Sequence, residues 1–381
     1  MDREVSVFYK NYVNLKRTSL RITFANDISR EAMDVWTRNF NRNETQPDVY
    51  HLGSIVDLVR QHHSGIKVFP DVTDIVTGGF PCQDFSLAGK RRGFNSHRDH
   101  RGNFSNENVA SIETRGKLYM WMKEVIEITK PRLFIAENVR GLVNLENVKE
   151  IIRADFASSI SGGYIVLEPM VLNAADYGVP QSRERVFFIG IRKDCLNPEA
   201  SDMLTKDTIP SLYYPYPVET HDYNNRKNGL LPYLKTGDIF EGLLEPELSD
   251  DLSHMHFSRA KFMGQHCQGQ IEVNPDSVSP TIRSEHHGNI EFRRLSPEHG
   301  GKIIKEECNN GLNERRLTPR ECGLLQTFPP DFEFVIKPSR GKPGVSASAA
   351  YKVIGNAVPP LLAYRFARRI EEIWDLYFRN D

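Results

Sequence analysis

Cys82 is the residue with the clearest potential for covalent chemistry. It directly follows Pro81 at the end of the stretch TGGFPC (77–82), and a polar, glycine-containing segment comes after it. A free thiol has a pKa near 8.5, so it becomes a strong nucleophile only where nearby dipoles or cations favour the thiolate. Most lone cysteines are small buried apolar residues, and Cys82 taken alone is best interpreted in that way.

Three charged residues elsewhere in the chain change this balance. Glu137 begins the stretch ENVRGL (137–142), at the expected end of a strand, and Arg183 and Arg185 lie two residues apart in QSRERVFFIG (181–190). Residues two apart on a strand share a face, so we expect both guanidinium groups on the same side. Taken singly, Glu137 can be a surface carboxylate and each arginine a solvated charge.

Alternating strands and helices must position these residues. Apolar runs and helical spacing predict strands at 20–27, 71–80, 131–139, 164–174 and 185–194, and helices at 28–40, 115–130 and 148–160. This order predicts an α/β fold with an open, mostly parallel, doubly wound sheet, in which ligands bind at the carboxyl ends of strands.

The pattern breaks down between residues 196 and 314. Residues 196–251 are mostly acidic, whereas 252–305 carry most of the basic residues of this segment and six histidines. Regular structure returns at 315–328, where Thr318, Pro319 and Glu321 predict a helix start with a capping box, and a last amphipathic helix is expected at 359–378. We therefore expect a catalytic domain at 1–195, a small domain at 196–314 and a C-terminal segment at 315–381.

Composition limits the class of protein. The 381 residues carry a formal net charge of −1, so a nucleic-acid surface has to be local. The five cysteines are scattered without a CxxC pair, and no apolar run approaches the roughly 20 residues that span a bilayer. We expect a cytoplasmic, monomeric protein. Its histidines and cysteines match no usual zinc spacing, so no metal is expected.

The segments around Cys82, Glu137, Arg183 and Arg185, followed by RRLTPRECGLLQTFP (315–329) and YKVIGNAVPP (351–360), resemble the ordered motifs of DNA (cytosine-5) methyltransferases of the bacterial restriction–modification type. The resemblance covers about residues 20–195 and 315–375. It implies the S-adenosylmethionine-dependent methyltransferase fold, with residues 196–314 as the target-recognition domain. Double-stranded DNA and a cognate restriction endonuclease are the implied partners.

The resemblance also implies a mechanism. Cys82 adds to carbon 6 of a flipped-out cytosine, so that carbon 5 can attack the sulfonium methyl group. Glu137 donates to ring N3 and accepts from the amino group, which requires a raised pKa. One of Arg183 and Arg185 supports the catalytic loop, while the other reaches the cytosine carbonyl or a phosphate.

For S-adenosylmethionine, the resemblance implies that Asp27 binds the ribose hydroxyls and Ile28 packs on adenine. Asp27 alone can equally be a helix N-cap. Ser54 and Ile55 stand where the family has an aspartate before an apolar residue, so the serine is a departure. The remaining residues implied in this pocket are Pro81, Leu118 and Asn356.

DNA contacts are expected from two segments. The catalytic loop after the nucleophile supplies Gln83, Ser86, Lys90, Arg91 and Arg92. Residues 279–295 combine Arg, His, Asn and Glu, which can read base edges, and supply Arg283, Arg293 and Arg294. A polar hairpin that supports the small domain is an equal alternative for this second segment.

The resemblance implies a first strand with a glycine-rich cofactor loop about 20 residues before Asp27. Residues 1–19 do not match this strand and loop, and the first glycine is Gly53. A truncated start, a separate subunit that supplies the loop, and a diverged protein with impaired cofactor binding are the three explanations. Two other functions stay open. One is a catalytically silent DNA-binding remnant, and the other is a tRNA cytosine methyltransferase of the same fold.

Overall fold

A computed structural model describes residues 15–40, 49–80, 119–144, 147–223, 229–259, 262, 271–284, 291–302, 305–341 and 343–379. Within these ranges the helices of eight or more residues are α1 (Arg30–Phe40), α2 (Ile55–His63), α3 (Tyr119–Thr129), α4 (Val148–Ala157), α10 (Ala347–Asn356) and α11 (Pro360–Tyr377). The shorter ones are α5 (Pro198–Leu204), α6 (Thr236–Phe240), α7 (Leu252–Met255), α8 (Lys305–Asn309) and α9 (Pro319–Leu325). No helix in the described ranges is long and apolar enough to cross a membrane.

The central sheet has five strands, with β3 (Ile75–Gly79), β4 (Leu133–Val139), β7 (Glu184–Arg192) and β5 (Tyr164–Val166) in that order; β6 (Met170–Asn173) also pairs with β7. β3 and β4 are parallel, whereas β7 is antiparallel to β4, β5 and β6. Four of these five strands run in the same direction, as expected for a mostly parallel sheet. Most neighbouring strands are nevertheless paired antiparallel, because they pair with β7. Among these five strands β7 is the reversed one, and it lies between strands that share one direction.

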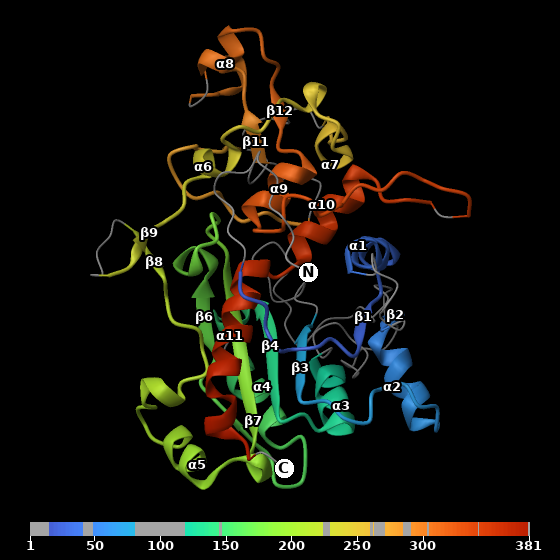
Figure 1. The fold of residues 1–381 in the computed structure, drawn as a ribbon, viewed down its shortest axis with the longest axis vertical. Helices are drawn as coiled ribbons and strands as arrows, with labels where there is room; N and C mark the ends of the chain where they lie inside the picture. The colour runs from blue at the N-terminus through green and yellow to red at the C-terminus, as the bar shows by residue number, and fades with distance from the viewer. Residues whose placement is uncertain are drawn as a thin grey trace.

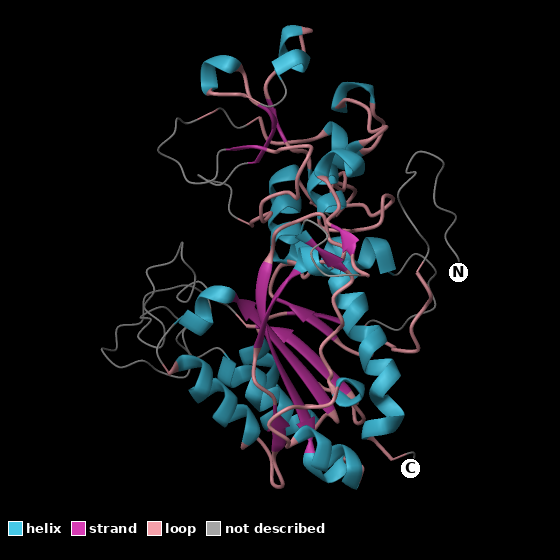
Figure 2. Cartoon of the chain, turned by 90° about the vertical axis from the view of Figure 1, so that its left-hand side faces the viewer, coloured by secondary structure: helices cyan, strands magenta, loops and turns pink. Residues whose placement is uncertain are grey.

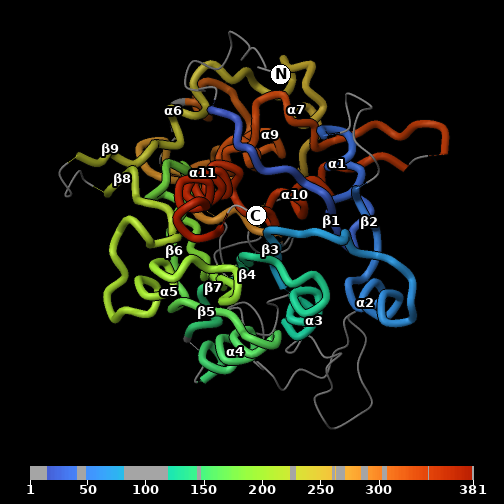
Figure 3. The backbone as a smooth tube through the Cα atoms, turned by 60° about the horizontal axis from the view of Figure 1, so that its bottom comes forward, coloured from blue at the N-terminus to red at the C-terminus, as the bar shows by residue number. Residues whose placement is uncertain are grey.

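Both faces of this sheet are covered, as the doubly wound prediction requires. Along β4 and β7, alternate residues enter two separate cores, as the period of two in a strand demands. Leu133 and Ile189 pack with α5 and α11, whereas Phe134 and Phe188 pack with α3 and α4. Figures 2 and 3 show the two helical layers on opposite sides of the strands.

The first two strands form a separate parallel pair, β1 (Ala25–Asp27) and β2 (Tyr50–Leu52). Within the described residues this pair has no hydrogen-bonded strand neighbour in the central sheet, so residues 20–80 do not all belong to one sheet as expected. Packing of α2 against α3, through Val59 and Trp121, joins this part to the rest (Figure 1).

A second core lies in the part of the chain that we call the upper lobe, residues 236–356 (Figure 1). Its strands are β10 (Ile271–Glu272), β11 (Glu291–Arg294) and β12 (Arg315–Arg316), and a further strand pair, β8 (His221–Asp222) with β9 (Leu231–Pro232), precedes it. Phe240, Leu317 and Ile354 share the lobe's apolar core. Residues 315–356 thus pack with the expected recognition segment.

Leu196, Ala200, Tyr213 and Tyr216, by contrast, pack in the core of the central sheet. The core of the central sheet therefore extends past the predicted boundary at 195/196, as far as Tyr216. The core of the upper lobe extends past the predicted boundary at 314/315, as far as Ile354.

Two local predictions are confirmed. Thr318 accepts from the Glu321 backbone while the Glu321 side chain accepts from the Thr318 backbone, which is the expected capping box at the start of α9. α11 places an apolar stripe (Leu362, Phe366, Ile370, Ile373 and Tyr377) against the central sheet.

Candidate active site

Glu137 lies at the carboxyl end of β4, where β3 also ends. The two strands are parallel, and Glu137 is in register with Gly79. A Cβ atom on Gly79 would lie 3.1 Å from Glu137 Oε2, so the glycine leaves room for this carboxyl group. Asn138 Nδ2 donates to the Phe80 carbonyl at 3.2 Å and holds the end of β3 in place. The segment that leads to Pro81 and Cys82 therefore starts beside Glu137.

The carboxyl group of Glu137 pairs with Arg185. Arg185 Nε lies 3.0 Å from Glu137 Oε1, and the two side chains are only 15% and 19% exposed. Burial raises the pKa of Glu137, while the positive charges of Arg185 and Arg183 oppose that rise. A raised pKa favours the acid form of this carboxyl group, which is the form that can donate a proton or a hydrogen bond.

Arg183 has different partners. It is 1% exposed, and its guanidinium donates to the carbonyls of Ile282 at 2.9 Å, Gly355 at 2.8 Å and Ala357 at 3.0 Å. The two arginines of the QSRER stretch thus divide their contacts: Arg185 faces Glu137, and Arg183 joins the sheet to the upper lobe.

Several expected site residues lie outside the described residues. These are Pro81, Cys82, Gln83, Ser86, Lys90, Arg91, Arg92 and Leu118.

The two expected cofactor pairs follow neighbouring strand ends. Asp27 pairs in register with Leu52, so the residues after β1 and after β2 meet at the same edge. Asp27 is exposed, and Ile28 beside it is 60% exposed. An exposed carboxylate next to an exposed apolar surface fits a ligand with ribose hydroxyls and a flat ring.

Local roles are also visible for these residues. Asp27 Oδ1 accepts from the Ser29 backbone at 2.7 Å, a turn contact that supports the start of α1. Ser54 occupies the N-cap position of α2, but its side chain makes no capping hydrogen bond. Ile55 packs partly into the α2–α3 core. Asn356, at the end of α10, is exposed.

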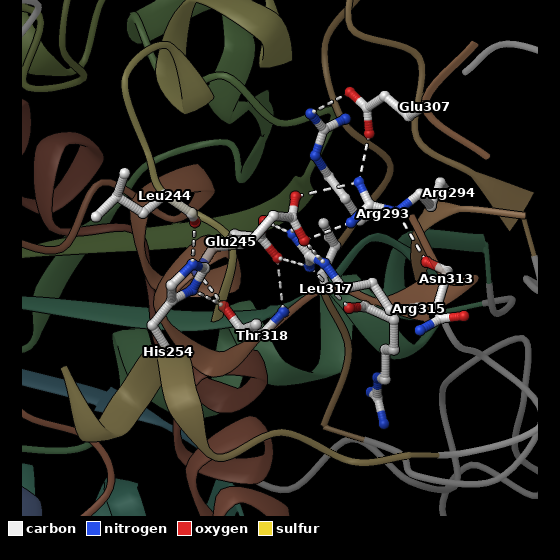
Figure 4. A network of polar contacts seen from close by, with 12 residues as sticks. Leu244, Glu245, His254, Arg293, Arg294, Glu307, Asn313, Arg315, Leu317 and Thr318 are labelled. Carbon is white, nitrogen blue, oxygen red and sulfur yellow. Dashed lines mark hydrogen bonds and ion pairs between the residues drawn. The ribbon is translucent and has the colours of Figure 1, made fainter. Parts of the chain in front are cut away.

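Arg293 and Arg294, expected to touch DNA, belong instead to an ion-pair network in the upper lobe (Figure 4). Arg294 is 1% exposed, and its guanidinium pairs with both Glu245 and Glu307. Arg293 pairs with Glu307 at 3.1 Å and covers the ring of Phe240. Arg294 is therefore buried and paired within the protein, so its expected role as a DNA contact is corrected to a structural one.

The same network reaches the start of α9. Arg315 Nη1 lies 2.8 Å from Glu321, and its Nε lies 3.0 Å from Glu245. His254 Nε2 donates to the Leu244 carbonyl (2.7 Å), because a carbonyl can only accept, and His254 Nδ1 is hydrogen-bonded to the Thr318 hydroxyl (2.8 Å). Among the described residues no group of three or more histidine, cysteine or acidic side chains is arranged to hold a metal ion.

Arg283 remains an accessible cation. It is exposed, and it directly follows Ile282, which Arg183 holds.

Three amide side chains were not singled out from the sequence: the buried Gln181 and Gln326, and the half-buried Asn173. Asn173 Oδ1 accepts from the Arg183 backbone at 3.1 Å, and Gln181 Nε2 donates to Gln326 Oε1 at 2.6 Å. Both glutamines stand within quoted motifs, QSRER and LQTFP, so their place in these motifs was the available signal. No sequence signal indicated that these two glutamines, 145 residues apart, would pair with each other.

Comparison with known proteins shows the family of the chain. The family model for C-5 cytosine-specific DNA methylase matches residues 12–372. The type II methyltransferase M.NgoFVII of Neisseria gonorrhoeae is 29% identical over 365 residues, which cover 91% of this chain and 83% of that protein. M.MthTI of Methanothermobacter thermautotrophicus is 31% identical over 319 residues, 80% of this chain and 79% of the relative.

The fold agrees as well. The crystal structure of S. pombe Dnmt2 methyltransferase superposes with a TM-score of 0.55 and 16% identity, over 93% of this chain and 92% of that one. The matching family model covers nearly the whole chain. The chain therefore belongs to the C-5 cytosine-specific DNA methylase family and is a DNA (cytosine-5) methyltransferase whose methyl donor is S-adenosylmethionine.

Proposed function

We propose that the protein methylates carbon 5 of one cytosine within a specific duplex DNA sequence, with Cys82 as its nucleophile. One observation carries the proposal: Glu137 is largely buried beside Arg185, its pKa is raised, and it lies next to Phe80, which is two residues before Cys82. Such a carboxyl group can assist addition to a pyrimidine ring, which a neutral cytosine resists without a proton donor.

The proposed reaction has two bond-forming steps. The Cys82 sulfur adds to carbon 6 of the cytosine while Glu137 donates to ring N3, which makes carbon 5 nucleophilic. Carbon 5 then takes the sulfonium methyl group that S-adenosylmethionine supplies. A base from solvent then takes the carbon 5 proton, and the electron pair of that bond expels the Cys82 sulfur from carbon 6 as a thiolate. Ring N3 returns its proton to Glu137, which releases the methylated base. In this proposal Arg185, which contacts Glu137, donates to the cytosine carbonyl.

The cytosine has to leave the duplex, since a stacked base cannot reach a buried carboxyl group. In this proposal the loop residues Gln83, Ser86, Lys90, Arg91 and Arg92 contact the DNA backbone, and exposed Arg283 contacts DNA from the upper lobe. The enzyme acts as a monomer, with a cognate restriction endonuclease that cuts the same sequence.

Cofactor binding is proposed at the edge formed by the ends of β1 and β2. Asp27 binds the ribose hydroxyls and exposed Ile28 packs on adenine. Exposed Asn356, together with Ser54, Ile55, Pro81 and Leu118, completes the pocket. The serine at position 54 lacks the charge of an aspartate and contributes a weaker hydrogen bond.

The test starts by expressing the gene in a bacterial host without cytosine methylation and mapping 5-methylcytosine in its DNA. Duplexes of the mapped sequence with 5-fluorocytosine at the target, incubated with S-adenosylmethionine, should trap a covalent complex because fluorine cannot leave as the proton does. Cys82→Ser should give none. An equal adduct with Cys82→Ser, or methylation of tRNA in place of duplex DNA, would contradict the proposal.

A further inference from the structure

Three buried polar side chains meet where the central sheet joins the upper lobe. Gln181 and Gln326 are fully buried, and Arg183 is 1% exposed. Gln181 and Arg183 precede β7, whereas Gln326 ends α9. We call these three residues the polar junction. Buried amides and guanidinium groups are costly unless fully paired, so the partners of each decide its role.

The two glutamines can be hydrogen-bonded in only one orientation. The Ile282 backbone donates to Gln181 Oε1 at 3.0 Å, which leaves Gln181 Nε2 to donate to Gln326 Oε1 at 2.6 Å. Gln326 Nε2 then donates to the carbonyls of Ile354 and Ala357, at 2.8 and 2.9 Å. Since carbonyls only accept, reversing either amide would break the chain of hydrogen bonds.

Arg183 closes the same network. Its guanidinium donates to the Ile282 carbonyl and, on the other side, to the carbonyls of Gly355 and Ala357. Ile282 is thus held at both its N–H and its carbonyl. The turn at 354–357 is held at three of its carbonyls, all by the polar junction.

These two segments also touch each other directly. A Cβ atom on Gly355 would lie 2.3 Å from the carbonyl carbon of Arg283 and 2.3 Å from the Ser284 nitrogen. The backbone at the end of α10 therefore lies directly against the backbone that carries Arg283. Only glycine permits this approach.

The polar junction is also adjacent to the catalytic pair. Arg183 is two residues before Arg185, which contacts Glu137, and the Arg183 backbone is itself held by Asn173 Oδ1 at 3.1 Å. A displacement of the polar junction would consequently also move the start of β7, which carries Arg185.

We infer that Gln181, Arg183 and Gln326 are positioning residues that hold the DNA-facing segment before Arg283 and the cofactor-facing turn around Asn356 in one arrangement. This inference rests on the proposed function, which assigns Arg283 to DNA and Asn356 to the cofactor. All three side chains are buried and bind other parts of the protein, so they would act by holding these segments. Because one buried network fixes both segments, binding of DNA and binding of the cofactor are thermodynamically coupled.

Coupling can be measured at equilibrium. In a Cys82→Ser background, which prevents adduct formation, the Kd for the mapped duplex is determined by fluorescence anisotropy with and without saturating S-adenosylhomocysteine. We expect the cofactor product to tighten DNA binding about 5-fold or more, within the usual range of allosteric coupling. Arg183→Lys loses the planar fork, and Gln326→Leu loses two donors and an acceptor, so each should bring this ratio close to one.

A matched control is Ser253→Ala. Ser253 is 1% exposed in the upper lobe, and its hydroxyl accepts from the Phe334 and Val335 backbones at 3.1 Å, so its loss also removes buried hydrogen bonds. It should lower the melting temperature but leave the coupling ratio at the parental value. If Arg183→Lys or Gln326→Leu fails to fold, Gln181→Glu is used in its place. This variant loses the amide group that donates to Gln326.

Two outcomes would overturn the inference: a coupling ratio near one in the parent protein, or a parental ratio in folded Arg183→Lys and Gln326→Leu. Neither outcome affects the covalent trapping by Cys82, so failure of the junction and failure of the proposed function are separable.

Discussion

Arg185 Nε lies 3.0 Å from Glu137 Oε1 in a largely buried pair at the carboxyl end of β4. Burial favours the neutral carboxyl group, whereas the guanidinium favours the carboxylate, and burial is the larger effect on the pKa of Glu137. The pKa of Glu137 is therefore raised above its usual value, less than burial alone would raise it. Each partner can be altered separately.

Glu137→Gln tests the proton itself. The amide keeps the shape of the side chain and one hydrogen-bond donor, but it cannot transfer a proton to the ring. We expect the single-turnover methylation rate to fall about 10²–10⁴-fold, the usual contribution of a general acid, with the Kd for duplex DNA changed only a few-fold. A rate within about 10-fold of the parent would remove Glu137 from the mechanism.

Arg185→Gln tests the charge beside Glu137 through the pH dependence. The acid form is the one that donates, so the rate should fall as pH rises through the raised pKa of Glu137. Without the guanidinium that lowers this pKa, the falling limb should move to higher pH, while the maximal rate decreases. Single-turnover rates between about pH 5 and 9 measure both effects. A limb that moves to lower pH would show that the two groups are not coupled in this way.

Arg294→Ala distinguishes a structural cation from a DNA contact. Its removal leaves Glu245 and Glu307 without this partner, and because those carboxylates are partly exposed we expect a loss of about 3 kcal/mol in the free energy of unfolding, at the lower end for buried pairs. The DNA Kd of the folded variant should stay within a few-fold of the parent.

The matched exposed cation is Arg283. Its replacement by alanine should change the free energy of unfolding by less than about 0.5 kcal/mol. DNA binding should weaken, and the slope of log K against log salt should drop by about 1 if the contact is to a phosphate. Urea unfolding measures the stability of both variants, and salt titrations measure their DNA binding. If Arg283→Ala lost stability and Arg294→Ala lost DNA binding, the structural and DNA-binding roles would be assigned the wrong way round.

Glu291→Gln tests a buried acid in the upper lobe. Burial raises the pKa of Glu291 to about 7, although Arg316 and Arg283 oppose the rise. A raised pKa in the folded state means that stability is full below the ordinary pKa of glutamate and is lost as pH rises through about 7. The loss amounts to about 3 kcal/mol. The glutamine variant should match the parent near pH 4.5 and exceed it near pH 8. The measurement is urea unfolding of both proteins at both pH values. The same difference in unfolding free energy between variant and parent at the two pH values would refute the prediction.

Local sequence patterns determined the secondary structure and the order of the motifs. The apolar runs of β4 and β7, the capping box of Thr318 and Glu321, and the stripe of α11 all depend on residues close in sequence, and each is confirmed. The placement of Glu137 at a strand end is of the same kind, since it requires only the end of an apolar run.

Long-range contacts decided the rest. β7 is reversed between β4 and β5, although nothing in its own residues states its direction. Arg183 and Arg294 look like surface cations in the sequence, yet both are buried, because Ile282, Gly355 and Ala357 surround one and Glu245 and Glu307 surround the other. A side chain's charge is a property of its type, whereas its burial and its partners depend on segments that lie far away in the sequence.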